Sequence, residues 1–244
     1  MDLPKIVSRE EWLVSRKKLL KKEKEFTRQR DELNAERRSL PMVKIEKEYS
    51  FEGPDGKAGL TDLFENRRQL IVYHFMFDPD WEEGCASCSF VVDNIGNLSH
   101  LLARNTTLAL VSRAPLAKIE KYKTRMGWNL PWYSSYEDDF NHDFKVTMGK
   151  IKDKGEYNYR DATGLVKNLN GRMMELPGIS VFIQDVGSVF HTYSSYARGL
   201  DILLGTYHYL DLTPLGRQED WEEPSGRSSD KSMSWLRRHD QYDS

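Results

Sequence analysis

The apolar positions of the chain form short blocks that are separated by turn residues. The strongest block is residues 70–77 (LIVYHFMF), where nearly every side chain is apolar or aromatic. This composition predicts a strand that is buried on both faces. Asp78-Pro79-Asp80 ends the block, and the apolar residues that follow have helical spacing: Phe90, Val91, Ile95, Leu98, Leu101 and Leu102. We therefore expect a strand, a loop and then a helix that begins near Cys85.

Further blocks of the same kind surround this stretch. Alternation over 43–51 predicts a strand, and the turn residues 53–56 follow it. The remaining patterns predict a short helix at 61–64, a strand over 106–112, a helix over 116–126, a short strand within a connector at 128–146, a hairpin of strands 179–184 and 189–193, and a final helix over 200–210. Strands that alternate with helices at these spacings predict an α/β fold with parallel strands.

Residues 8–40 form a long charged segment with helical character. Ser8 and Glu11 fit a capping box at its start, and Pro41 ends it. Apolar residues recur in it at every seventh position: Trp12, Leu19, Phe26, Leu33 and Leu40. We interpret this stripe as a face that docks on the chain's own domain, because a second apolar position per heptad is mostly missing. A homodimer through this helix is the alternative.

The same patterns divide the chain into three parts. Residues 1–41 are predicted to be an N-terminal helical extension, 42–215 the main domain and 216–244 a C-terminal tail. The tail is expected to be mostly extended or mobile, with Trp235-Leu236 able to dock. Within the main domain, 147–175 has little periodicity and many Lys, Gly and Asn residues. We interpret it as an insertion before the final hairpin.

Composition and charge narrow the class of protein. The 244 residues are 39% hydrophobic and 30% charged, which is typical of a globular protein. A net charge of −2 and a pI near 6.3 do not indicate a basic surface that would bind nucleic acid or an anionic membrane. No apolar run approaches the roughly 20 residues of a membrane helix, and the N-terminus lacks the pattern of a signal peptide. A cytoplasmic location is therefore expected.

Cys85 and Cys88 are the chain's two cysteines, and they lie where the predicted helix begins. Amide groups at a helix N-terminus favour a thiolate, so Cys85 is the candidate nucleophile. Cys88 lies one turn further on the same face and is the candidate resolving thiol. A structural zinc site needs two further ligands, and none of the six histidines offers a second short ligand spacing. We predict neither a metal nor a cofactor; an inert, reduced cysteine pair is the remaining alternative.

Several residues near the cysteines are candidates for shaping the site. Trp81 either shields the thiols or covers the loop. Arg113 follows the strand 106–112 and either holds an anion or is a surface arginine. We slightly favour the surface arginine. His74, in mid-strand, is interpreted as a core histidine. Glu82 and Glu83 oppose thiolate formation if they pack against Cys85.

The order of these elements resembles the thioredoxin fold, in the branch of peroxiredoxin-like proteins and thioredoxin-like reductases. More closely, the chain resembles a bacterial thioredoxin-like family of unknown function. The matching segments are VSREEW, YHFMFDPDWEEGCASCS, VSRAPLAKIEKY, MGWNLPWYSS, HTYSSYARGLD, YHYLDLTPLGR and WLRRHDQY. The resemblance implies a central mixed sheet flanked by helices and a redox CxxC motif, without a substrate.

Two features depart from the related families. The position of the thioredoxin cis-proline is occupied by Ile179, and the nearest proline, Pro177, is two residues early. The peroxiredoxin loop with its hydroxyl residue is missing, because Pro79 is one residue too close to Cys85. We predict a thiol–disulfide oxidoreductase that acts on a protein or small-molecule disulfide. The alternatives are a peroxiredoxin-like thiol peroxidase and a non-catalytic thioredoxin-like binding module.

Overall fold

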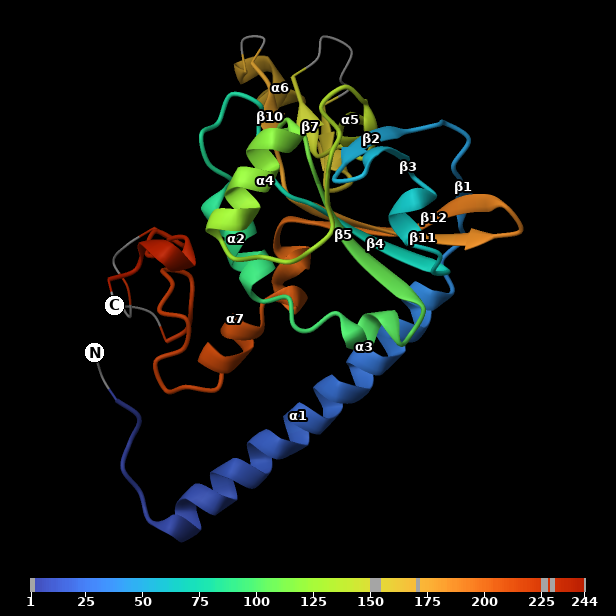
Figure 1. Ribbon diagram of the computed structural model, residues 1–244. Coiled ribbons are helices and arrows are strands. Elements are labelled where there is room, and N and C mark those ends of the chain that lie inside the picture. Colours follow the sequence, from blue (N-terminus) through green and yellow to red (C-terminus); the bar gives the residue numbers. More distant parts are fainter. Residues whose placement is uncertain (1–2, 150–154, 170–171, 225–227, 229–230, 244) are drawn as a thin grey trace. The chain divides into compact units, whose positions relative to one another are not determined.

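An eight-stranded mixed sheet forms the centre of the computed structural model (Figure 1). The structure describes residues 3–149, 155–169, 172–224, 228 and 231–243. The strand order is β1-β12-β11-β4-β5-β6-β2-β3. The strands are β1 (Val43–Lys44), β2 (Ser50–Gly53), β3 (Gly56–Gly59), β4 (Gln69–His74), β5 (Thr106–Ser112), β6 (Trp132–Ser134), β11 (Gly178–Asp185) and β12 (Ser188–Tyr196).

The four strands β12-β11-β4-β5 give the sheet its thioredoxin-like character. β4 pairs in parallel with β5, while β11 pairs antiparallel with both β4 and β12. The α-helix α2 (Ala86–Asp93) connects β4 to β5, and α4 (Leu116–Arg125) connects β5 to β6. The α/β fold with a mixed central sheet and flanking helices is therefore confirmed, as is the final hairpin, whose strands are longer than predicted.

The helices α2 and α4 lie together on one face of this sheet (Figure 1). The Ser89 hydroxyl of α2 bonds the Tyr122 hydroxyl of α4 at 2.8 Å, which joins the two helices. Neighbouring side chains of β4 point to opposite faces. His74 consequently packs on the other face, where its ring stacks on Phe144 and lies close to Phe140 of α5 (Phe140–Asp143).

The main core fills the face that α5 covers. Its largest fully buried members are aromatic or branched apolar side chains: Phe51, Leu63, Phe64, Leu70, Phe140 and Phe182. Burying each such side chain contributes roughly 1.5–3 kcal/mol to folding. The 3₁₀ helix η1 (Asp62–Phe64) adds two of these residues, which explains why the short helix predicted at 61–64 forms there.

Two predicted elements differ from the observed ones. The strand expected over 43–51 is two separate strands, since β1 pairs with β12 and β2 pairs with β3 and β6 at the other side of the sheet. The helix expected to run from Cys85 through Leu102 ends at Asp93, and α3 (Ser99–Leu102) is a separate turn. Residues 94–98 (NIGNL) interrupt it, because Asn and Gly favour turns over a helix interior.

The stretch predicted as an insertion contains short regular elements. β7 (Thr147–Met148) pairs with β10 (Met174–Glu175), and β8 (Glu156–Tyr157) pairs with β9 (Arg160–Asp161). The helix α6 (Thr163–Asn168) lies between β9 and β10 in sequence. The helix predicted at 200–210 is a 3₁₀ segment, η2 (Ala197–Leu203), followed by α7 (Gly205–Leu210).

The chain divides into two compact units. One contains Met42–Tyr207 and Trp235–Ser244, and the other contains Met1–Pro41 and His208–Ser234. In the second unit, α1 (Arg9–Arg38) has the predicted capping box, in which Glu11 N–H donates to the Ser8 hydroxyl at 3.2 Å and Ser8 N–H donates to the Glu11 carboxylate at 3.0 Å. No helix in the described part of the chain is long and apolar enough to span a membrane.

Candidate functional site

A loop returns the chain from the end of β4 to the start of α2 and so positions Cys85. The loop turns at Asp78–Trp81, where the Trp81 N–H donates to the Asp78 carbonyl at 3.0 Å. Cys85 N–H then donates to the carbonyl oxygen of Met76 at 3.1 Å, which fixes the residue beside the end of the strand. Cys85 is the N-cap residue of α2, and its carbonyl accepts bonds from the Ser89 N–H and hydroxyl.

Cys85 and Cys88 approach each other to 4.2 Å across the first turn of α2. Both are free thiols; Cys85 is half-buried, whereas Cys88 is 1% exposed. The Cys85 sulfur lies 3.1 Å from the Ser87 hydroxyl oxygen, and the Cys88 sulfur accepts the Met76 N–H at 3.4 Å. The expected placement of the two thiols on one element and close together is thus observed.

The surroundings shift the pKa values of the two thiols in opposite directions. A hydrogen bond from the Cys88 thiol is the largest influence that lowers the pKa of Cys85, to about 6. The Ser87 hydroxyl and the backbone N–H groups of Ser87 and Cys88 act in the same direction, and burial opposes them. Burial raises the pKa of Cys88 well above its ordinary value. At neutral pH the site therefore holds one half-buried thiolate and one buried thiol.

The acidic residues before Cys85 do not counteract its ionisation. Both oxygens of the Glu83 carboxylate bind arginines, one Arg125 and the other Arg238 at 2.8 Å. Glu82 is exposed, and neither carboxylate is among the principal influences on the pKa of Cys85. Glu83 is instead paired with the two guanidinium groups, so its charge is compensated beside the thiol.

Arg238 also secures the backbone in front of Cys85. Its guanidinium donates to the Gly84 carbonyl at 2.6 and 3.1 Å and to the Tyr122 hydroxyl at 3.0 Å. Gly84 is buried so closely that an added Cβ would lie 2.6 Å from the Phe75 ring and 2.8 Å from the Tyr122 ring. A side chain at this position would displace the loop, so the glycine is needed for the close approach.

Trp81 and Arg113 lie together, beside the turn that leads to Cys85. Both line a cavity of about 620 Å³, whose lining residues do not include either cysteine. Trp81 is 38% exposed. The Arg113 side chain is 13% exposed and pairs with the buried Glu175 at 2.8 Å and with Asp78 at 3.6 Å. The favoured interpretation of Arg113 as a surface arginine is therefore wrong.

His74 has the role of a core residue. It is 1% exposed, and its ring nitrogens lie 2.9 Å from the Ser180 hydroxyl and 3.4 Å from the Asn141 side-chain oxygen. Burial lowers the pKa of His74 to about 3, so the ring is neutral. The pKa and the satisfied contacts leave it no part in acid–base chemistry at neutral pH.

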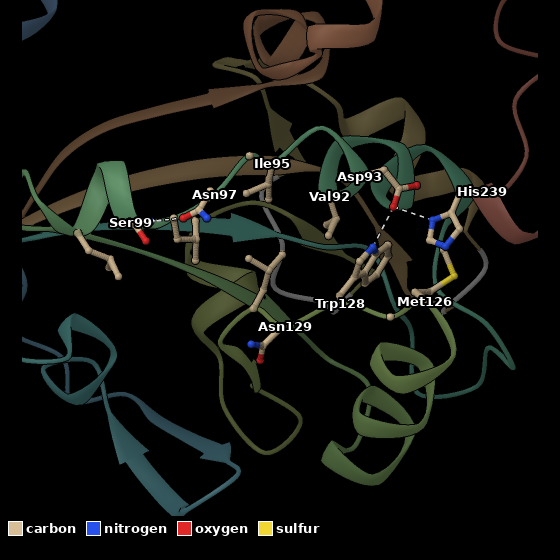
Figure 2. A pocket seen from close by; sticks show the side chains of 14 residues that line it. Val92, Asp93, Ile95, Asn97, Ser99, Met126, Trp128, Asn129 and His239 are labelled. Atoms are coloured by element: carbon tan, nitrogen blue, oxygen red, sulfur yellow. Dashed lines mark hydrogen bonds and ion pairs between the residues drawn. The ribbon is translucent and has the colours of Figure 1, made fainter.

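A second cavity, of about 550 Å³, lies at the other end of α2 (Figure 2). Its apolar wall includes Val92, Ile95 and the Trp128 ring. The Asp93 carboxylate accepts bonds of 2.8 Å from both the Trp128 indole and the His239 ring, as the dashed lines in Figure 2 show. Cys88 and the first α2 residue that lines this cavity, Val92, are four residues apart, which is about 6 Å along the helix axis.

Comparison with known proteins identifies the family. The model of the family DUF899, described as a bacterial protein of unknown function, matches residues 1–242. The chain belongs to this family. No match was found among curated proteins.

Solved structures resemble the DUF899 chain only distantly. The peroxidoxin BcpB of Mycobacterium tuberculosis has a TM-score of 0.44 at 14% identity, over 70% of this chain and 97% of that one. The bacterioferritin comigratory protein of Xanthomonas campestris has a TM-score of 0.41 at 14% identity, over 64% and 88%. A mutant of PrxQ from Xylella fastidiosa has a TM-score of 0.42 at 12% identity, over 66% and 88%. Such low similarity gives no information about activity.

Sequence reasoning missed three residues that secure the thiol site of this DUF899 chain: Ser89, Tyr122 and Arg238. Each of the three is a common polar residue whose neighbours in sequence indicate only a helix or a tail. Their hydrogen bonds depend on how α2, α4 and the segment that contains Arg238 pack together. The nearest sequence signal for Arg238 is the motif WLRRHDQY, one of the segments that carry the family resemblance. In the described residues, no group of three or more His, Cys, Asp or Glu side chains is arranged to hold a metal ion.

Proposed function

We propose that the protein is a thiol–disulfide oxidoreductase in which Cys85 is the nucleophile and Cys88 the resolving thiol. The observation that supports this most strongly is the pairing of a half-buried thiol of lowered pKa with a buried thiol of raised pKa, 4.2 Å away. A reactive pair needs this asymmetry, because one sulfur must attack as a thiolate while the other stays protonated until it resolves the intermediate.

The reaction has two exchange steps. The Cys85 thiolate attacks one sulfur of the substrate disulfide, the S–S bond of the substrate breaks, and the first substrate sulfur leaves as a thiolate. Cys88 then loses its proton to that leaving thiolate, and its sulfur attacks the Cys85 sulfur. The bond between Cys85 and the second substrate sulfur breaks, and this sulfur leaves as a thiolate. The substrate has gained two electrons and the protein holds a Cys85–Cys88 disulfide, which an external dithiol must reduce.

A thiol peroxidase is the second candidate. The Ser87 hydroxyl, 3.1 Å from the Cys85 sulfur, is a hydrogen-bonding group beside the thiolate, and it favours this alternative. Attack of the thiolate on a hydroperoxide would break the O–O bond, oxidise Cys85 to sulfenic acid and release an alcohol. Cys88 would then condense with the sulfenic acid and release water. The pair of close thiols argues against the third alternative, a non-catalytic binding module.

One comparison separates the two activities. Insulin-disulfide reduction and hydroperoxide consumption are measured side by side, with dithiothreitol as the reductant, for the wild type, Cys85→Ser and Cys88→Ser. We expect insulin reduction well above the dithiothreitol background, abolished in Cys85→Ser, with little hydroperoxide consumed. Fast hydroperoxide consumption that depends on Cys85, without insulin reduction, would favour the peroxidase. Neither activity in the wild type would favour the binding module.

We also propose that α1 pairs with α1 of a second copy of the chain, in an antiparallel arrangement. No residue of α1 is buried, and its apolar stripe is exposed, with Leu19 at 52% and Phe26 at 65%. Basic residues dominate residues 16–24, whereas residues 25–38 carry four acidic and four basic side chains: Glu25, Asp31, Glu32, Glu36, Arg28, Arg30, Arg37 and Arg38. Antiparallel pairing centred on Phe26 places Arg16 opposite Glu36 and Lys21 opposite Asp31, while parallel pairing opposes two basic halves.

A further inference from the structure

Tyr73 carries a buried hydroxyl group that forms no hydrogen bond of normal geometry within the described residues. The residue lies on β4 and is 2% exposed. Buried polar groups are nearly always paired, because an unpaired one loses its bonds to water without compensation. An unpaired hydroxyl next to a reactive site therefore points to a partner that changes its state during the reaction.

Cys88 is the group that acts on Tyr73. After burial, Cys88 is the largest influence that raises the pKa of Tyr73. Conversely, Tyr73 lowers the pKa of Cys88, as does the Met76 N–H that lies 3.4 Å from the Cys88 sulfur. The Cys88 sulfur therefore accepts one N–H beside the end of β4, and the unpaired Tyr73 hydroxyl of the same strand is the second donor near it.

The other titratable groups around Cys88 have different partners or roles. Cys85 belongs to the same reaction. The Tyr157 hydroxyl of β8, which also interacts electrostatically with Cys88, donates to the Pro177 carbonyl at 2.8 Å and accepts the Ala197 N–H at 3.2 Å. Tyr157 is therefore engaged in holding the segment before β11, whereas the Tyr73 hydroxyl is available.

We propose that Tyr73 is a positioning residue for the resolving step, in which its hydroxyl donates a hydrogen bond to the Cys88 sulfur as that sulfur becomes a thiolate. This inference rests on the proposed function. Cys88 is almost fully buried, so its ionised form needs donors within the protein. Tyr73 remains protonated throughout, because burial and Cys88 raise its pKa well above the ordinary value. It is a donor, and the proton of Cys88 still leaves with the first substrate thiolate.

Tyr73→Phe tests the inference, since it removes only the hydroxyl. The reaction with 5,5′-dithiobis(2-nitrobenzoate) releases one coloured thiolate when Cys85 attacks and a second when Cys88 resolves. We expect an unchanged first phase and a second phase about tenfold slower at neutral pH, with its pH profile displaced upward by about one unit. Tyr196→Phe is the matched control: Tyr196 is buried, and its hydroxyl donates to the Phe144 carbonyl at 3.0 Å. It should lower the melting temperature and leave both phases unchanged.

A second measurement does not depend on turnover. In Cys85→Ser protein with ¹³C-labelled cysteine, Cys88 gives a single Cβ resonance whose pH titration reports its pKa. Adding Tyr73→Phe should raise that pKa by about one unit, a tenfold smaller thiolate population at a given pH. 3-Fluorotyrosine incorporated at position 73 is a stronger hydrogen-bond donor than tyrosine, so it should accelerate the second phase. This variant tests the role of the hydroxyl even if Tyr73→Phe does not fold.

The outcomes distinguish the two proposals. An unchanged second phase and an unchanged Cys88 titration in Tyr73→Phe would overturn the role of Tyr73, whatever the protein does with insulin. A changed Cys88 titration without any insulin reduction would support the contact between Tyr73 and Cys88 and reject the proposed function. Loss of both phases in Tyr73→Phe, with no acceleration by fluorotyrosine, would show that the residue is only structural.

Discussion

The Arg238 guanidinium donates a hydrogen bond of 2.6 Å to the carbonyl oxygen of Gly84, the residue immediately before Cys85. The same side chain pairs with Glu83 at 2.8 Å, so it fixes both the backbone and the charge in front of the thiol. The segment Trp235–Ser244 therefore belongs to the thiol site, although it lies about 150 residues further along the chain.

Replacing Arg238 should weaken both the fold and the thiolate. Arg238→Ala removes bonds to Gly84, Tyr122 and Glu83, and bonds to charged groups contribute roughly 1.5–3 kcal/mol each at most. We expect a lower melting temperature and a raised pKa of Cys85, because Glu83 loses one of its two arginines. Urea unfolding and the pH dependence of alkylation measure the two effects.

Arg238→Lys and Lys121→Ala are the controls for that experiment. A lysine keeps the positive charge but lacks the planar guanidinium group. Compared with Arg238→Ala, it should therefore restore the ion pair with Glu83 but not the two hydrogen bonds to the Gly84 carbonyl. Lys121 is exposed on α4, and its removal should change neither quantity. A wild-type pKa of Cys85 in Arg238→Ala would show that the arginine does not influence the thiol.

The reactivity of Cys85 should follow a pKa of about 6. This folded value lies below the unfolded value of about 8.5, so the ionised thiol stabilises the folded state. The stabilisation is fully present above pH 8.5 and is lost as the pH falls towards 6. The melting temperature of the reduced protein, compared with Cys85→Ser between pH 5 and 9, should show this dependence, and alkylation should begin near pH 6. A midpoint near 8.5 would mean that the surroundings of Cys85 do not favour its thiolate.

The buried ion pair of Arg113 with Glu175 should be important for stability. The Glu175 side chain is 1% exposed and also accepts the Thr147 hydroxyl at 2.9 Å. Glu175→Gln leaves a buried guanidinium without its main counter-charge, which costs roughly 3–5 kcal/mol. The control is Glu65→Gln, whose partner Arg67 lies 2.8 Å away in a half-exposed pair, where the expected cost is roughly 0–1 kcal/mol. Equal effects of the two substitutions on urea unfolding would contradict the expectation.

Polar substitutions in the stripe of α1 should affect self-association. Leu19→Gln with Phe26→Gln should convert a dimer to a monomer in light scattering, since each residue loses apolar burial of roughly 1.5–3 kcal/mol. Val14→Gln is the matched control, because Val14 is 57% exposed on the same helix but lies off the seven-residue stripe. A wild-type protein that is already monomeric at high concentration would reject the pairing.

Local patterns predicted most of the fold because they arise from single elements. The run 70–77, the helix from Ser8 and the hairpin before Tyr196 each carry their own periodicity or capping signal. The alternation of segment 43–51 predicts one strand, whereas the pairing that separates β1 from β2 is non-local and leaves no local pattern.

The candidate site was predictable only in part, for the same physical reason. The position of Cys85 at a helix start and the burial of Cys88 follow from neighbouring residues. The contacts of Arg238 and Tyr73 depend on the packing of distant segments, and neither residue type is unusual in its own stretch. Arg113 was placed on the surface because its partner Glu175 lies in a stretch without periodicity.

Trapping of the mixed disulfide tests the assigned roles of the two thiols most directly. Reduced wild type, Cys85→Ser and Cys88→Ser are treated at neutral pH with an equimolar disulfide reagent, and the adducts are located by mass spectrometry. We predict a persistent adduct on Cys85 in Cys88→Ser, a Cys85–Cys88 disulfide in the wild type and almost no adduct in Cys85→Ser. Adducts formed at equal rates on Cys85 and on Cys88 in the two single variants would contradict the assignment.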